Sequence, residues 1–129
     1  SDQPEYSRRG GIMVGQGSQE PFTRISVKTA KEMLDLGDSV VVDVRQVDEW
    51  ISGHVNGAIH IPVDEVLARV SELPEDKNLL FICAAGQRSA LACEMAAAMG
   101  CTPEQLFNIE EGTPTWIESN FPTSYNYDP

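Results

Sequence analysis

The chain has 129 residues and a mass of 14.1 kDa, which fits one domain of ordinary size. Nine basic residues against 20 acidic ones give a net charge of −11, which argues against nucleic acid or an anionic membrane surface as a partner. No apolar run reaches the roughly 20 residues that a membrane-spanning helix needs.

Short β-type runs alternate with helical patterns along the chain. Strands are predicted at residues 22–26, 40–44, 58–61, 79–82 and 105–109, and helices at 27–36, 46–52, 64–73, 88–99 and 113–119. Ser26 and Gly37 fit the cap and the stop of the first helix, and Thr113-Pro114 fits the start of the last. The alternation predicts a three-layer α/β/α domain with a mostly parallel sheet.

Composition divides the chain into three parts. Residues 1–20 are rich in glycine and polar side chains and are interpreted as a flexible N-terminal arm. Residues 21–122 form the domain. Residues 123–129 are predicted to be a C-terminal tail that lies along the surface or frays.

The cysteine pattern bears on the compartment. Three cysteines, without a Cys-x-x-Cys pair, fit neither a disulfide scaffold nor a structural zinc site. A free thiol favours a reducing compartment, and the sequence therefore predicts a cytoplasmic protein. A processed exported form stays open as an alternative, because the chain begins at Ser1 rather than methionine.

The segment Cys83-Ala84-Ala85-Gly86-Gln87-Arg88-Ser89 follows a predicted buried strand and leads directly into a helix. Its small residues let backbone N–H groups turn inward as an anion-binding nest, and the helix adds its positive amino end. Cys83 is therefore expected as a thiolate with a lowered pKa, and Arg88 as a holder of an anionic substrate. The alternative is a core thiol at Cys83 and a solvated Arg88.

Two further motifs precede this loop in the sequence. They are Asp43-Val44-Arg45 and the stretch Glu-Trp-Ile-Ser-Gly-His-Val-Asn-Gly-Ala-Ile-His-Ile-Pro at residues 49–62. Together with the Cys-x-x-Gly-x-Arg-Ser loop, they resemble rhodanese domains of the single-domain sulfurtransferase type. The resemblance extends over residues 22–122.

This resemblance implies a five-stranded, mostly parallel sheet between helices. It also implies transfer of a sulfane sulfur from a small anionic donor such as thiosulfate to a thiophilic acceptor, cyanide or a thiol, through a persulfide at Cys83. A protein is a further candidate for donor or acceptor, and no cofactor or metal is expected. The implied substrate-binding residues are Ala84, Ala85, Gly86, Gln87, Arg88 and Ser89, with Asp43 and Arg45 supporting the loop.

Two other functions stay open. In one, Cys83 carries sulfur for a protein partner, or the domain is regulatory. In the other, the chain is a cysteine-dependent phosphatase or arsenate reductase. Phosphatases of this fold use a Cys-x5-Arg loop, whereas Cys83 and Arg88 form the shorter Cys-x4-Arg, which suits the smaller persulfide sulfur.

Two positions depart from the family pattern near its end. Glu111 occupies a site that is usually glycine, and Asn120 replaces the last glycine, where asparagine tolerates the left-handed backbone. Outside the loop the default interpretations are structural. His54 is expected to make hydrogen bonds in a turn, Cys93 to pack in a helix, and His60 to bind no metal.

Overall fold

The structure is a computed structural model that describes residues 20–129. The predicted arm, residues 1–20, therefore lies outside the described residues except for Glu20. The strands are β1 (Thr23–Ile25), β2 (Ser39–Asp43), β3 (His54–Val55), β4 (Ile59–His60), β5 (Asn78–Ile82), β6 (Leu106–Ile109) and β7 (Thr123–Ser124). The helices are α1 (Val27–Leu36), α2 (Val47–Ile51), α3 (Val66–Arg69), α4 (Gln87–Ala98) and α5 (Gly112–Glu118), with short 3₁₀ turns η1 (Val63–Glu65), η2 (Val70–Glu72) and η3 (Pro103–Gln105).

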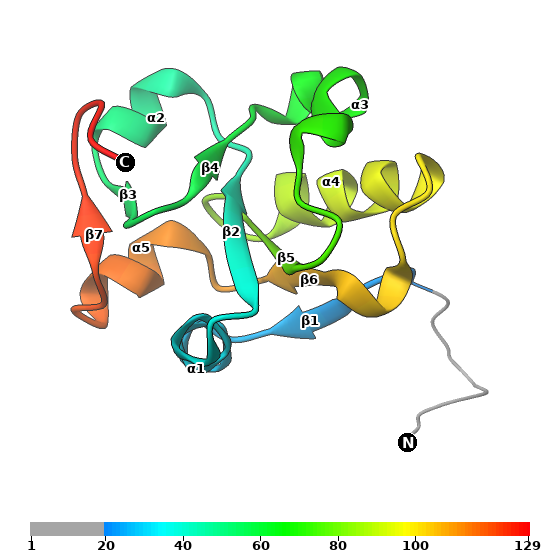
Figure 1. Cartoon of the computed structure of the whole chain (residues 1–129). Helices are drawn as coiled ribbons and strands as arrows, with labels where there is room; N and C mark the ends of the chain where they lie inside the picture. Colours follow the sequence, from blue (N-terminus) through cyan, green and yellow to red (C-terminus); the bar gives the residue numbers. More distant parts are fainter. Residues whose placement is uncertain (1–19) are drawn as a thin grey trace.

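Five strands form one sheet in the order β1-β6-β5-β2-β4, and every neighbouring pair is parallel (Figure 1). Strand β5 lies in the middle, with β2 on one side and β6 on the other. Its last residue, Ile82, is in register with Asp43 of β2 and with Ile109 of β6. The predicted fold is confirmed, and the carboxyl ends of these strands meet at one edge.

Both faces of the sheet are buried, which explains the continuous apolar strands. Successive residues of β5 alternate between two core clusters. Leu79 and Phe81 pack with the α4 residues Ala92 and Ala96, whereas Leu80 and Ile82 pack on the face that α1 and α5 cover. Helices α3 and α4 thus form one outer layer, and α1 and α5 form the other (Figure 1).

Helix α1 has the ends that its sequence predicts. The backbone N–H of Thr29 donates to the Ser26 hydroxyl at 3.1 Å, and Gly37 ends the helix with a left-handed φ of 90°. Helix α4 likewise spans residues 87–98, one residue earlier at each end than predicted. Local capping is sufficient to determine these boundaries.

The predicted helix at 64–73 is wrong. This segment contains η1, the four-residue α3 and η2, and the backbone leaves the helical region at Arg69 (φ −119°). Two β-branched residues, Val66 and Val70, weaken the helix, and burial of Val66 and Leu73 in the core determines the path.

The last helix also begins differently from its prediction. Helix α5 starts at Gly112, so Thr113 lies inside the first turn and does not cap the helix. Its hydroxyl instead donates to the carbonyl oxygen of Cys83 at 3.3 Å. A tertiary hydrogen bond therefore takes the place of the predicted local cap.

The C-terminal residues lie along the domain and are joined to it. Strand β7 pairs with β3 in a small antiparallel sheet, and the Asn126 N–H donates to the Ile51 carbonyl at 2.8 Å. The buried ring of His54 lies with its two nitrogens 2.7 and 2.6 Å from the carbonyl oxygens of Trp50 and Asp128. His54 thus joins α2 to the tail, a structural role.

Candidate active site

The loop of residues 83–89 lies at the carboxyl edge of the sheet. Cys83 directly follows β5, and Gly86 is the N-cap of α4 with a left-handed φ of 93°. Asp43 ends the adjacent strand β2, and the Val44 N–H bonds the Ile82 carbonyl at 3.0 Å. The parallel sheet thereby brings both motif segments together, as ligand sites of such sheets require.

Hydrogen-bond donors surround the Cys83 sulfur, although the residue is only 1% exposed. The Gly86 N–H donates to Sγ at 3.1 Å, and the Ser89 N–H donates to it at 3.4 Å. The Ser89 hydroxyl oxygen lies 3.3 Å from the same sulfur. These groups belong to the first turn of α4, whose amino end adds a positive potential.

This environment lowers the pKa of the Cys83 thiol. Burial opposes ionisation and raises the pKa, but hydrogen bonds from the Ser89 side chain and from the backbone of Ser89, Ala85 and Gly86 outweigh it. The other two cysteines have the opposite shift. Burial raises the pKa of Cys93 in α4 and that of the partly exposed Cys101.

Alkylation tests this contrast. At pH 6.5, iodoacetamide should label Cys83 before Cys93 or Cys101, because only Cys83 has a pKa below the ordinary thiol value. For the same reason its labelling rate should rise less between pH 6.5 and pH 9 than that of an unperturbed thiol. Peptide mapping by mass spectrometry identifies the site, and earlier labelling of Cys101 would contradict the assignment.

Asn108 completes the polar network behind the sulfur. The Ser89 hydroxyl oxygen lies 2.5 Å from the Asn108 side-chain oxygen, and the Asn108 amide donates to the Gly86 carbonyl at 3.2 Å. Asn108 is fully buried in β6. The Ser89 hydroxyl has a single proton and two acceptors within reach, Asn108 and the Cys83 sulfur. Asn108 therefore positions Ser89.

A second turn supports the loop from behind. The Thr113 N–H donates to the Cys83 carbonyl at 2.9 Å. Gly112 has a left-handed φ of 84°, and a Cβ on it would lie 2.0 Å from the Ala84 carbonyl oxygen. A Cβ on Gly86 would likewise lie 2.8 Å from the Glu110 carbonyl oxygen. The two turns approach so closely that both positions require glycine.

Asp43 and Arg45 form a buried ion pair beside the loop. The Arg45 guanidinium donates to both carboxylate oxygens, at 3.0 Å from Nε and 2.8 Å from Nη2. Nη2 also donates to the Gly53 carbonyl at 2.8 Å. The pair connects the end of β2 to the turn after α2, so these two residues hold the frame of the site.

Arg88 contacts a carboxylate. Its two terminal nitrogens donate to the two oxygens of Glu49 in α2, at 2.8 and 2.9 Å. The hydrogen bonds from Arg88 lower the pKa of Glu49 to about 2, although burial acts to raise it. The carboxylate is therefore ionised throughout the neutral range, and it occupies both terminal nitrogens of the guanidinium.

Ala85 and Gln87 are exposed and line a cavity of about 450 Å³ next to the loop, together with Arg24, Glu94 and Glu110. Ala84 is half-buried and contributes its carbonyl to the close approach with Gly112.

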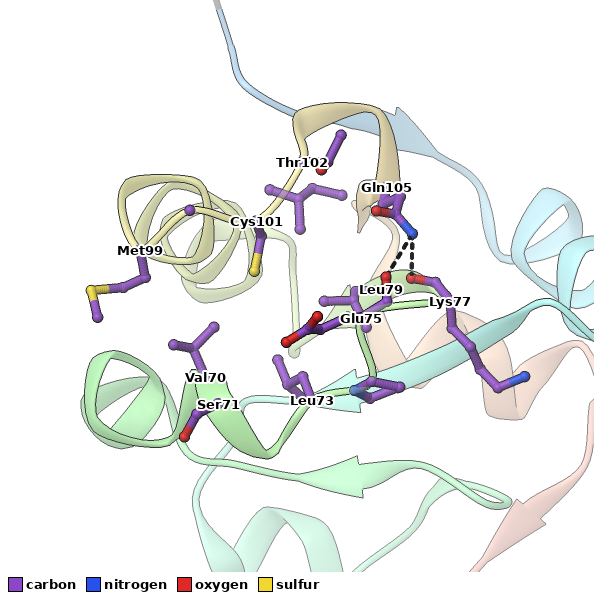
Figure 2. A pocket seen from close by; sticks show the side chains of 13 residues that line it. Val70, Ser71, Leu73, Glu75, Lys77, Leu79, Met99, Cys101, Thr102 and Gln105 are labelled. Carbon is purple, nitrogen blue, oxygen red and sulfur yellow. Dashed lines mark hydrogen bonds between the residues drawn. The ribbon is translucent and has the colours of Figure 1, made fainter.

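A separate cavity of about 510 Å³ lies at the opposite edge of the sheet, where β5 and β6 begin (Figure 2). Leu79, the second residue of β5, and Leu106, the first residue of β6, line it. Cys101 lines it, and the Gln105 amide donates to the Glu75 and Lys77 carbonyls at its side. The parallel strands separate this cavity from Cys83.

Two departures from the family pattern acquire a structural explanation. The Glu111 carboxylate accepts a hydrogen bond from the Val27 N–H at 2.7 Å and so satisfies the amino end of α1. Asn120 has a φ of 59°, the left-handed conformation predicted for it. Neither side chain makes a hydrogen bond to the Cys83 loop among residues 20–129.

Sequence reasoning did not assign four residues of this site: Glu49, Asn108, Gly112 and Thr113. Asn108 had a usable signal, since it is a polar residue within an apolar strand of the sheet. Glu49 lies in the motif at residues 49–62, but its contact to Arg88 spans 39 positions and has no local signature.

Among residues 20–129, no group of three His, Cys, Asp or Glu side chains is placed to bind a metal ion. None of the helices in this range is long and apolar enough to cross a bilayer.

Comparison with known proteins identifies relatives of this arrangement. The model of the rhodanese-like domain matches residues 26–119. The chain is 30% identical over 112 residues to a putative sulfur carrier protein of Bacillus subtilis, covering 86% of this chain and 59% of that protein. It is 27% identical to a sulfurtransferase of Allochromatium vinosum, covering 75% and 89%. A crystal structure of a rhodanese-related protein from Thermoplasma volcanium superposes with a TM-score of 0.70 at 31% identity, covering 80% and 98%.

Proposed function

Because the chain belongs to the rhodanese-like domain family, we propose that it is a sulfurtransferase that carries a sulfane sulfur on Cys83. One observation supports this most directly: the Cys83 sulfur accepts N–H groups from Gly86 and Ser89 at the amino end of α4. Such donors stabilise negative charge on sulfur. In the reaction this charge is present on the Cys83 thiolate and again on the Cys83 persulfide. The names of several relatives include sulfur transfer, and this supports the same class.

The proposed reaction has two steps. With thiosulfate, the Cys83 thiolate attacks the outer sulfur, the donor S–S bond breaks, and sulfite leaves with the bonding electron pair. A new S–S bond makes Cys83 a persulfide anion. Cyanide or a thiolate then attacks the outer sulfur of this persulfide, and the electron pair of the S–S bond returns to Cys83 as thiolate.

Persulfide formation also changes what the site presents to solvent. Cys83 is only 1% exposed, so a bulky acceptor has little access to the Sγ atom of Cys83. An S–S bond moves the reactive sulfur outward by about 2 Å. The loop residues Ala85, Gly86 and Ser89 would remain hydrogen-bond donors to the inner or outer sulfur. Asp43 and Arg45 hold the end of β2 beside this loop and do not react.

Intact mass spectrometry of the full chain tests the proposal. After incubation with thiosulfate or methanethiosulfonate, the protein should gain the mass of one sulfur atom at Cys83. Cyanide should remove that mass and release thiocyanate. Absence of added sulfur with both donors would contradict the proposal, and so would hydrolysis of an aryl phosphate by unloaded protein.

A sulfur-carrier role is the second candidate, favoured by the name of the Bacillus subtilis relative. The chain spans 59% of that protein's length. A carrier would load sulfur but release it slowly to cyanide or small thiols. The same mass measurement distinguishes the two, because release is followed separately from loading. A reducing cytoplasm would suit either role, since a persulfide is readily oxidised.

A further inference from the structure

Arg88 and Glu49 form a bidentate ion pair, in which each terminal nitrogen of the guanidinium donates to one carboxylate oxygen. The two hydrogen bonds are parallel, at 2.8 and 2.9 Å, and the side chains are 34% and 32% exposed. Glu49 is also fixed on its own helix, because its Oε1 accepts the Gln46 N–H at 3.0 Å in a capping box. The carboxylate is therefore held in place from two directions, and Arg88 is not a free cation at the loop.

Other arginines near the loop are paired as well. Arg45 is bound to Asp43 and is 5% exposed. Arg24, on the wall of the 450 Å³ cavity, forms ion pairs with Glu20 and Glu110. Within residues 20–129, each guanidinium that borders the loop or this cavity thus has a carboxylate partner, and a Cys83 thiolate adds one further negative charge.

We propose that Glu49 is a specificity-determining residue that withholds Arg88 from anionic donors, so that the site selects sulfane-sulfur donors of low negative charge over the thiosulfate dianion. This inference rests on the proposed sulfur transfer at Cys83. A bidentate guanidinium–carboxylate pair is among the stronger polar contacts in proteins. A dianion must separate this pair or approach a carboxylate and a thiolate without a free guanidinium to offset their charge, whereas a persulfide, which carries at most one negative charge and none when protonated, meets a smaller cost.

The atoms balance for such a donor. The Cys83 thiolate attacks the terminal sulfur of a persulfide R–S–SH, the S–S bond of the donor breaks, and RS⁻ leaves with the electron pair. The proton stays on the transferred sulfur, which is now bound to Cys83. The leaving group RS⁻ carries one negative charge beside Glu49, whereas sulfite carries two.

Glu49→Gln tests the proposal, because the amide keeps the shape of the side chain and an oxygen for the Gln46 N–H. The rate constant for loading by thiosulfate, followed by intact mass, should rise about tenfold or more. Loading from the persulfide of N-acetylcysteamine should stay within about threefold of the original rate. Methanethiosulfonate, a monoanion with otherwise similar chemistry, should lie between them.

Two controls separate local from general effects. Asp48→Asn removes the same charge from an exposed neighbour that forms no hydrogen bond or ion pair with Arg88, and it should leave the donor preference unchanged. Adding Arg88→Gln to Glu49→Gln should cancel the gain with thiosulfate. An unchanged thiosulfate rate in folded Glu49→Gln, or an equal gain in Asp48→Asn, would overturn the proposal. If no donor loads the unaltered chain, sulfur transfer itself is wrong.

Discussion

Replacing Cys83 by serine should abolish both sulfur loading and thiocyanate release. A hydroxyl cannot form a persulfide. In this variant the N–H groups of Gly86 and Ser89 would surround an oxygen atom in place of the sulfur. Serine is close in size to cysteine, so the fold should be retained. The measurement is intact mass after incubation with donor, followed by colorimetric detection of thiocyanate.

The matched control is Cys93→Ser. Cys93 is fully buried in α4, and its thiol has a raised pKa and points toward the Phe107 carbonyl at 3.5 Å. This variant should load sulfur at nearly the rate of the unaltered chain, with some loss of stability from the buried hydroxyl. Loading that persists in Cys83→Ser and disappears in Cys93→Ser would place the reactive sulfur elsewhere.

Gly112→Ala should be the most destabilising single-methyl change in the described chain. Its Cβ would lie 2.0 Å from the Ala84 carbonyl oxygen and 3.0 Å from the Cys83 carbonyl oxygen, so backbone must move. The left-handed φ of 84° adds strain. We expect a loss of roughly 3–5 kcal/mol in the free energy of unfolding, measured by urea denaturation.

Gly37→Ala distinguishes the steric clash of an added Cβ from the strain of the left-handed backbone. Gly37 has a similar φ of 90° at the end of α1, but a Cβ there would have no neighbour within 4 Å. This change should cost about 1 kcal/mol, the strain of the left-handed backbone alone. Gly112→Ala should also slow sulfur loading, because the displaced carbonyls belong to the Cys83 loop. Equal losses in the free energy of unfolding for the two variants would show that the close approach at Gly112 does not contribute to stability.

Local patterns in the sequence are sufficient to predict much of this fold. The Ser26 cap and the Gly37 stop predict α1 residue for residue, because both act within one helical turn. The apolar run at residues 79–82 predicts a strand buried on two faces, which β5 is. The Cys-x4-Arg loop between that strand and a helix identifies where the chemistry should lie, since the carboxyl ends of parallel strands meet at one edge.

Short and marginal elements were decided by tertiary contacts. The segment 64–73 breaks into three pieces because its valines pack into the core, and local propensity is too weak to oppose this. Strands β3 and β7 have two residues each and exist only because residues 68 and 70 positions apart pair across the domain. No pattern within either segment carries that information.

The sequence by itself determined the fold class, the position of the loop and the candidate role of Cys83, because each depends on residues close together in the chain. Only the tertiary structure decided the partner of Arg88. Its charge suits an anionic donor, but α2 places Glu49 within 2.9 Å of both terminal nitrogens. The loop's dependence on Gly112 and Asn108 is likewise tertiary, since both lie more than 18 positions from the residues they contact. Electrostatic and steric forces act through space, so these partners follow from the folded arrangement of α2, β6 and α5.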